Sequence, residues 1–524
     1  MLHERSADEL FAEDDFGWLE PVAGGAAVQA VPAPASLPPP RRARTRTPPR
    51  TLGRDLARLR AGIAERPSGL ALVLALLVAL ILATVVARSG LWGGGEKAAR
   101  TNAPPKAAAE ADGRETGVTA QPALRRAVGP GAEGRTVRGL QAGLLALGAS
   151  SQAPDGGYSG ATAAAVSSFQ AAHGLAADGV AGEDTAAALR EALVDEAAAD
   201  GADAKHALAA AAARGRLPRA AAKEHGRSVD RAIAAIGRLP ADRGGYVALV
   251  LHQVAGHGEA YDAPRTLALF GMLDANVAEL ARQAPGPKRD IRDADGVTYR
   301  FFPARGFEFH PLASFSRLNI DLAAGRQAAA ARLARALVAR GIREHGALEW
   351  EYSFSFGGPD RWVSGLAQAV AAQSLARVGA AAHDRGLSDA AAAAYRAIPA
   401  MLSRPLAGGT WVREYGFSDA AILNAQLQTI VSLTEYANTT GDARARALVA
   451  SMTTAARTLL PTLDTGCWSL YQVNGQPASV AYHSYHVLLL RQLAHLTGES
   501  IWSQTAARWA GYLRASGGTG PRIC

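Results

Sequence analysis

Residues 69–87 form an uncharged apolar run, "GLALVLALLVALILATVVA". A helix that crosses a bilayer needs about 20 predominantly apolar residues, and this run is close to that length. The run therefore predicts a transmembrane helix. A cleaved signal peptide is the competing interpretation, but its charged leading region would be far shorter than residues 1–68, which precede the run here.

Many arginines precede the apolar run, whereas few basic residues follow it closely. Because the cytoplasmic flank of a membrane helix carries the excess of Lys and Arg, we predict a single-pass protein with a cytoplasmic N-terminus. Everything after Arg88 is then expected on the extracytoplasmic side, in the periplasm or at the cell wall. A nucleic-acid-binding tail is the alternative interpretation of the arginines, but the predicted span explains them, so we expect no nucleic-acid partner.

The segments on either side of the run have compositions typical of flexible chain. Residues 1–68 are acidic at first and then rich in Pro and Arg, which predicts a disordered cytoplasmic tail. Residues 88–123 are rich in Gly, Pro, Ala and Thr, which predicts a flexible linker. The chain as a whole is 48% hydrophobic, so wholesale disorder is excluded.

Net charge and cysteine content leave the ligand class and the disulfide bonding of the chain undecided. The formal charge of +8 suits an anionic ligand such as a uronic-acid glycan, but it is equally a solubility property. Cys467 and Cys524 are the two cysteines of the chain, too few for a disulfide framework. One bridge between them stays open as an alternative.

Residues 124–193 carry apolar positions at helical spacing, and the helical segments stop at glycines, which predicts a small three-helix domain. The stretch resembles the peptidoglycan-binding-like domain that bacteria attach to cell-wall enzymes. The resemblance implies a cell-wall ligand, although a spacer module is the alternative. Ala-rich residues 194–226 are expected to form connecting helices. The matching motifs include Gly134, Leu140-Gln141, Asp155-Gly156, Phe169-Gln170, Asp178-Gly179 and Gly182.

Residues 227–524 contain a series of helical patterns separated by long loops rich in polar and aromatic residues. Two alternating segments, "VTYRFFP" and "GFEFHPL", interrupt the helices and predict a β-hairpin. The expected fold class is mainly α. It comprises an alpha-alpha toroid, or incomplete α/α barrel, with a short hairpin, the small three-helix domain and one transmembrane helix.

Four loop clusters from about Trp350 to Ser516 resemble the C-terminal catalytic region of D-glucuronyl C5-epimerases. Those enzymes convert glucuronate to iduronate in heparan sulfate precursors. The resemblance implies an isomerase that needs no cofactor and acts on a uronic-acid polysaccharide. The motifs that carry it are Trp362-x-Ser364 with Ala367-Gln368, Trp411 with Glu414-Tyr415, Leu423-Asn424, Asp464-Thr465-Gly466 with Tyr471, Tyr482-His483 with His486, and Arg508-Trp509.

The resemblance also implies roles for individual side chains. Tyr415 and Tyr482 are the preferred proton-transfer groups, Glu414 is a base or an orienting acid, and Tyr471 is a further catalytic or positioning phenol. A phenol suits this chemistry because it can donate or accept a proton, although its usual pKa of about 10 must be tuned by its surroundings. The residues expected to bind substrate are Arg361, Trp362, Arg413, Asn424, His483, His486 and Arg491, with the arginines placed to bind the uronate carboxylate.

Several alternatives stay open at this stage. His483 and His486 are spaced to bind zinc, but no third ligand is evident, so we predict no metal site. Tyr352, Phe354 and Phe356 alternate as in an ordinary packed strand, and Asp464-Thr465-Gly466 is also typical of a turn. The rival functions are a uronate polysaccharide lyase on a similar toroid and a non-catalytic glycan-binding protein of the cell wall.

Overall fold

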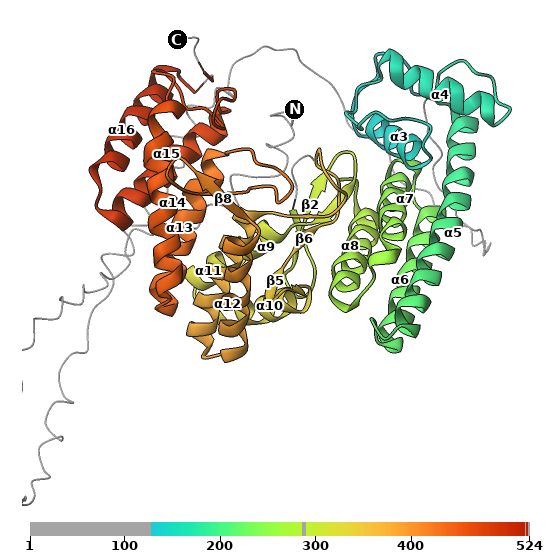
Figure 1. The fold of residues 1–524 in the computed structure, drawn as a ribbon. Coiled ribbons are helices and arrows are strands. Elements are labelled where there is room, and N and C mark those ends of the chain that lie inside the picture. Colours follow the sequence, from blue (N-terminus) through green and yellow to red (C-terminus); the bar gives the residue numbers. More distant parts are fainter. Residues whose placement is uncertain (1–126, 286–289, 519, 522–524) are drawn as a thin grey trace, which may run out of the picture. The chain divides into compact units, whose positions relative to one another are not determined.

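The computed structural model describes residues 127–285, 290–518 and 520–521, which form many helices and a few small antiparallel sheets (Figure 1). The mainly helical class predicted from the sequence is confirmed. The predicted tail 1–68, the predicted span 69–87 and the predicted linker 88–123 lie outside the described residues.

The predicted transmembrane helix needs correction. Among the helices that the structure describes, none is both long enough and apolar enough to cross a membrane. The longest of them, Glu183–Ala213, carries several acidic side chains, and charged side chains are costly in the hydrocarbon core of a bilayer. The single-pass topology and the extracytoplasmic placement, which depended on that helix, are not supported.

The first group of helices surrounds α7. Helix α3 packs on α7, α5 packs on α6 and α7, and α8 packs on α6 and α7. Helix α5 is continuous through residues 193 and 194, so the third helix of the small domain runs on into the Ala-rich segment. The bounds are α3 Arg135–Ala146, α4 Gly160–Ala172, α5 Glu183–Ala213, α6 Arg219–Arg238, α7 Ala241–Gly256, the short helix η2 Gly258–Ala260 and α8 Ala263–Arg282.

Glycines allow α3 and α7 to cross closely. A Cβ atom built on Gly245 of α7 would lie 2.7 Å from the backbone nitrogen of Gly143 on α3, and one built on Gly139 would overlap the backbone of Asp242. The two backbones are therefore in contact, and their buried side chains belong to one hydrophobic core. The segment that resembles a wall-binding domain is thus packed firmly onto the helices that follow it.

A three-stranded antiparallel sheet follows α8, with β1 Asp290–Arg292 beside β2 Thr298–Phe302 and β3 Gly306–Phe309. The pairing of β2 with β3 confirms the predicted hairpin. Asn276 of α8 fixes the edge of β3: its Nδ2 donates to the carbonyl of Phe307 at 2.7 Å, and its Oδ1 accepts from the Phe307 N–H at 2.9 Å.

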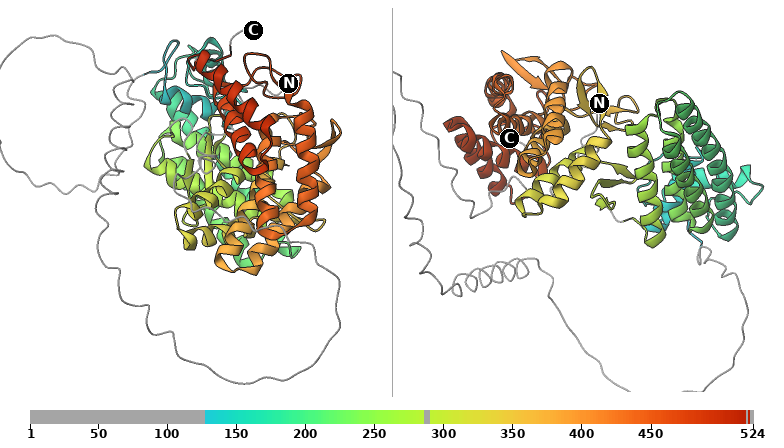
Figure 2. Two further views of the ribbon diagram at one scale, coloured as in Figure 1. Left: turned by 90° about the vertical axis from the view of Figure 1, so that its left-hand side faces the viewer. Right: turned by 90° about the horizontal axis from the view of Figure 1, so that it is seen from below.

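The remaining helices form pairs in two layers. Helices α9, α11, α13 and α15 pack one on the next, and each is followed by a helix that packs on it (yellow through orange to red in Figures 1 and 2). The bounds are α9 Pro311–Ala323, α10 Gln327–Ala339, α11 Gly365–Ala382, α12 Arg385–Ala400, α13 Leu423–Thr440, α14 Ala443–Leu459, η3 Leu460–Leu463, α15 Val480–Thr497 and α16 Ser500–Ala515.

Short two-stranded sheets lie between these helices. Strand β6 with β7 precedes α11, and β8 with β9 precedes α13. Since each of α11, α13 and α15 is followed by an outer helix that returns the chain, the loops before them gather at one end of the layer. The strands are β4 Ile342–Glu344, β5 Ala347–Glu349, β6 Glu351–Tyr352, β7 Trp362–Val363, β8 Ser403–Leu406 and β9 Gly409–Val412.

We predict that Gly245→Ala destabilises the protein by about 1–3 kcal/mol, because the added methyl group must push α3 away from α7. Thermal unfolding of the purified variant measures the effect. Gly237→Ala on α6 is the matched control, since its Cβ would meet the nearest atom at an ordinary 3.7 Å. Equal melting temperatures for the two variants would contradict a tight crossing.

Candidate active site

Backbone pairing brings together the loops that precede α11, α13 and α15. Ser364 and Tyr415 form an isolated antiparallel bridge, as do Ile422 and Gln472. The N–H of Leu423, the first residue of α13, donates to the carbonyl of Tyr471 at 3.0 Å. Segments far apart in the sequence therefore meet at the N-terminal ends of these helices.

The carboxyl group of Glu414 lies at the N-terminus of α11. Its Oε1 accepts a hydrogen bond from the Ser364 hydroxyl at 3.0 Å, and the oxygen of that hydroxyl accepts from the Ala367 N–H, also at 3.0 Å. Gly365 makes this approach possible, because a Cβ there would lie 2.6 Å from Cγ2 of Val412 and overlap the Arg413 carbonyl. The cap of α11 and the position of Glu414 thus depend on each other.

Burial dominates the electrostatics of Glu414. The residue is 1% exposed, and its Oε2 has no hydrogen-bond partner within the described part of the chain. Desolvation raises the pKa of this carboxyl to about 8, although its hydrogen bonds to Ser364 and to the Leu366 N–H act in the opposite direction. At neutral pH Glu414 is therefore mostly protonated and can donate a hydrogen bond.

The three predicted tyrosines form a chain of neighbours that begins at Tyr415, the residue after Glu414. Tyr471 lies close enough to Tyr415 to raise the pKa of the Tyr415 phenol, and the rings of Tyr471 and Tyr482 meet edge to face with centroids 4.8 Å apart. All three are buried. Burial first, and then the neighbouring Tyr471 and Glu414, raises the pKa of Tyr415 well above its usual value, so Tyr415 is a neutral phenol at rest.

Aromatic side chains form a wall on the other side of Tyr415. Trp362 meets the Tyr415 ring edge-on at 5.4 Å and stacks on Tyr352 at 4.4 Å. Phe356 lies 5.5 Å from Tyr415, measured between ring centroids. The indole N–H of Trp362 donates to the carbonyl of Phe354 at 2.8 Å, so Trp362 is fixed in the wall.

The predicted arginines point elsewhere. Although Arg413 precedes Glu414 in the chain, its Nε donates to Asp419 at 2.8 Å and its Nη1 donates to the Met401 carbonyl at 3.1 Å. Arg491 follows Tyr482 by two and a half helical turns, so it lies on the opposite, exposed side of α15. Neither cation is directed at the tyrosines.

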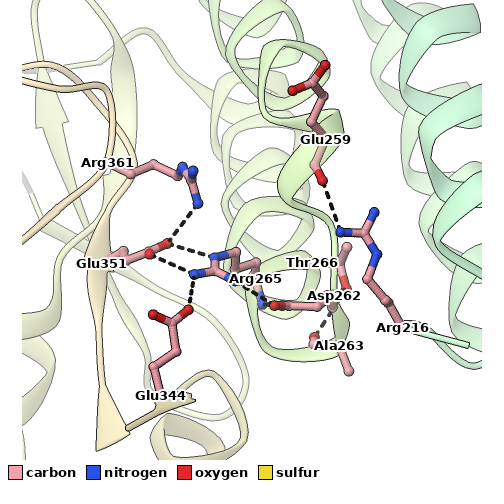
Figure 3. Close-up of polar contacts among 9 residues, drawn as sticks. All are labelled: Arg216, Glu259, Asp262, Ala263, Arg265, Thr266, Glu344, Glu351 and Arg361. Carbon is pink, nitrogen blue, oxygen red and sulfur yellow. Dashed lines mark hydrogen bonds and ion pairs between the residues drawn. The ribbon is translucent and has the colours of Figure 1, made fainter. Parts of the chain in front are cut away.

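Arg361 belongs to a separate ion cluster that joins α8 to the small sheets (Figure 3). Its Nη1 lies 3.8 Å from a carboxylate oxygen of Glu351. Arg265 of α8 binds the same carboxylate through Nε and Nη2 at 3.0 and 2.9 Å, and its Nη2 also reaches Glu344 at 3.1 Å. These contacts engage Arg361 in holding the scaffold together.

Unlike the predicted arginines, Asn424 has a fully buried side chain. It is fully buried at the start of α13, next to the residue that binds the Tyr471 carbonyl. Neither its amide nitrogen nor its amide oxygen has a hydrogen-bond partner among the residues that the structure describes. A buried amide without partners is costly, so its donor and acceptor are available to a bound polar group.

The predicted histidines share a serine that sequence reasoning missed. The Ser469 hydroxyl lies 2.8 Å from Nδ1 of His483 and 2.8 Å from Nδ1 of His486. Nε2 of His483 donates to the Trp509 carbonyl at 3.0 Å, and the Trp468 ring stacks on His483 at 3.8 Å. Burial lowers the pKa of His486 to about 3, so that imidazole is neutral. The contacts of His483 are those of a core residue.

Two other features of these loops were not assigned from the sequence. Ser364 stood in a recognised motif, and its place before a helix was the signal for an N-cap, but its bond to Glu414 depends on the fold. Cys467 is disulfide-bonded in the structure, while the second cysteine, Cys524, lies outside the described residues.

We predict that Glu414→Gln becomes more stable than the native protein as pH rises. The folded pKa is raised, so the native protein gains from the protonated carboxyl below the unfolded pKa of about 4.3 and loses that stability as pH rises through about 8. Glutamine has no proton to lose. In urea unfolding, the free energy of unfolding of the variant relative to that of the native protein should rise between pH 4 and pH 9, by at most about 5 kcal/mol. A difference that does not change with pH would contradict the buried acid.

Comparison with known proteins finds family models that match two parts of the chain. Residues 344–511 match the model of the D-glucuronyl C5-epimerase C-terminus, and residues 133–189 match a putative peptidoglycan binding domain. An uncharacterized protein of Methanocaldococcus jannaschii is 28% identical over 100 residues, 19% of this chain and 32% of that protein, so the match spans about a third of that relative. The two resemblances expected from the sequence are thus confirmed, in the expected order, and the segment with Glu414 and the tyrosines is similar to the epimerase C-terminus.

Proposed function

We propose that the protein is an epimerase that inverts C5 of D-glucuronate residues in a polysaccharide, giving L-iduronate. The observation that carries the proposal is the meeting of Glu414, Tyr415, Tyr471 and Tyr482 in one buried cluster within the epimerase-like segment. Residues 133–189 would hold the enzyme at the cell wall. Peptidoglycan contains no glucuronate, so this segment fixes location and the substrate is a different, uronic-acid polymer.

The chemical difficulty is the weak acidity of the C5 proton while the neighbouring carboxylate is charged. A site must reduce the effect of that charge and present two proton-transfer groups on opposite faces of the sugar. We assign the first task to Glu414. A protonated carboxyl in a dry site can donate a strong hydrogen bond to a carboxylate, and its Oε2 is not used by the described residues. The amide of Asn424 would offer a second donor nearby.

The tyrosines take the two proton transfers. Tyr415 is a neutral phenol at rest, which suits the group that donates a proton to C5. Tyr482 is set off from Tyr415 by Tyr471, and we assign it to the opposite face, where it removes the original proton. Tyr482 acts in its phenolate form and takes the proton as the C5–H bond breaks, while the Tyr415 phenol gives its proton to C5 on the other face. Proton exchange with solvent then returns Tyr482 to the phenolate and Tyr415 to the phenol, so the reaction consumes nothing else.

Incubation of the full chain with glucuronate-containing polymers in heavy water tests the reaction. Carbon-bound deuterium at C5, with inverted configuration by NMR, is the expected result. An unsaturated product that absorbs in the ultraviolet would mean that the C4 substituent is expelled and that the enzyme is a lyase. Binding of polymer without exchange across a broad panel would favour a glycan-binding protein.

Each of Tyr415→Phe and Tyr482→Phe is expected to reduce deuterium exchange by a factor of about 100 or more, because loss of a positioned acid or base typically costs 10²–10⁴. Tyr395→Phe is the matched control. Tyr395 is also buried but stacks on Tyr436, outside the cluster. This variant should therefore catalyse deuterium exchange at the native rate. If either variant keeps full exchange, the tyrosine that it replaces does not have the proton-transfer role assigned to it.

The pH profile separates the two roles open to Glu414. If the protonated carboxyl binds the substrate, kcat/KM should fall as pH rises through about 8, and Glu414→Gln should keep measurable activity without that fall. If Glu414 is instead the base, kcat/KM should rise through the same pH and the glutamine variant should be inactive. We expect the first result.

A further inference from the structure

A histidine and two acidic residues meet where α5 packs on α7. Glu196 and Asp200 lie one helical turn apart on α5, and His252 lies on α7. Ligand atoms of the three side chains all lie within 4.8 Å of one another. Nδ1 of His252 is 3.1 and 3.3 Å from the two carboxylate oxygens of Asp200.

We propose that Glu196, Asp200 and His252 bind one divalent transition-metal ion, with Zn²⁺ preferred because an imidazole nitrogen is among the donors. Ligands about 2.0–2.1 Å from a tetrahedral zinc lie roughly 3.3 Å from one another. The Asp200–His252 separation already fits this value. A rotation of the partly exposed Glu196 side chain completes the set.

The burial of the three residues suits a site that exchanges its ion with solvent. Asp200 is 8% exposed, and a buried carboxylate needs a positive partner. The side chain of His252 is 61% exposed, so it is well hydrated and reachable from outside.

The cluster also borders a hollow. Glu196 lines an open cavity of about 610 Å³ together with Phe169 of α4, the C-cap residue His173 and neighbouring residues of α5. Three protein ligands leave the fourth position of a tetrahedral zinc open to water or a ligand. An ion here would therefore lie at the rim of a cavity formed in part by the segment that matches the peptidoglycan-binding family.

An ion bound by His252 would also affect how α7 is held against the rest of the chain. The next residue, Gln253, donates to Glu308 at 2.9 Å and to the Ser353 carbonyl at 2.6 Å. An ion held by α5 and α7 would therefore cross-link the first group of helices close to the contacts that α7 makes with the epimerase-like part. We expect bound metal to stabilise this junction.

Metal binding is measured by calorimetry on the full chain after removal of bound ions with a chelator. We expect one Zn²⁺ per chain at a micromolar or tighter Kd and a higher melting temperature with metal. Co²⁺ serves as a spectroscopic probe of the same site. Mg²⁺ and Ca²⁺, which prefer all-oxygen ligands, should bind much more weakly.

His252→Ala and Glu196→Gln should each weaken Zn²⁺ binding by at least about tenfold, since even loss of a supporting contact to a ligand costs roughly 10- to 100-fold. His206→Ala, an exposed histidine on the same helix, is the matched control and should bind like the native chain. No Zn²⁺ binding, Zn²⁺ binding that survives His252→Ala, or a preference for Ca²⁺ would overturn the proposal and leave an ordinary Asp200–His252 ion pair.

Discussion

The burial of the Glu414 carboxyl is the constraint on which the candidate site depends. A carboxyl that is removed from water at the start of α11 must be hydrogen-bonded there, and Ser364 supplies the bond at 3.0 Å. The same serine caps α11, and Gly365 allows the two backbone segments to touch. Because Tyr415 is the next residue and pairs with Ser364, fixing the acid also fixes the phenol.

The surroundings of this acid keep positive charge away from it. Arg413 binds Asp419 and Arg361 binds Glu351, so both guanidinium groups are held by carboxylates of the scaffold. An arginine beside Glu414 would favour the ionised form and lower its pKa. Because neither guanidinium group is directed at Glu414, burial determines the protonation state of its carboxyl. A neutral acid beside the neutral phenol of Tyr415 can donate a hydrogen bond, whereas an ionised carboxylate could only accept one.

Sequence reasoning found the residues of the cluster but not the direction of the long side chains. Short motifs with fixed order marked Glu414, Tyr415, Tyr471 and Tyr482, and helix N-termini bring them together. The arginines could not be placed in this way, because a long flexible side chain beside a motif can point to either side of the backbone. His483 needed Ser469 and Trp509 from other segments before its core role was visible. The membrane helix rested on apolar length alone, and no described helix has that character.

Contacts continue from the segment that matches the peptidoglycan-binding family to the tyrosine cluster. The glycine crossing joins α3 to α7, and Gln253 of α7 bonds Glu308 of the hairpin and the Ser353 carbonyl. From there, Phe354 packs on Trp362, which packs on Tyr415. A module on a flexible linker would raise only the local concentration of the enzyme. Here the segment that matches the peptidoglycan-binding family and the epimerase-like segment instead contribute side chains to one hydrophobic core.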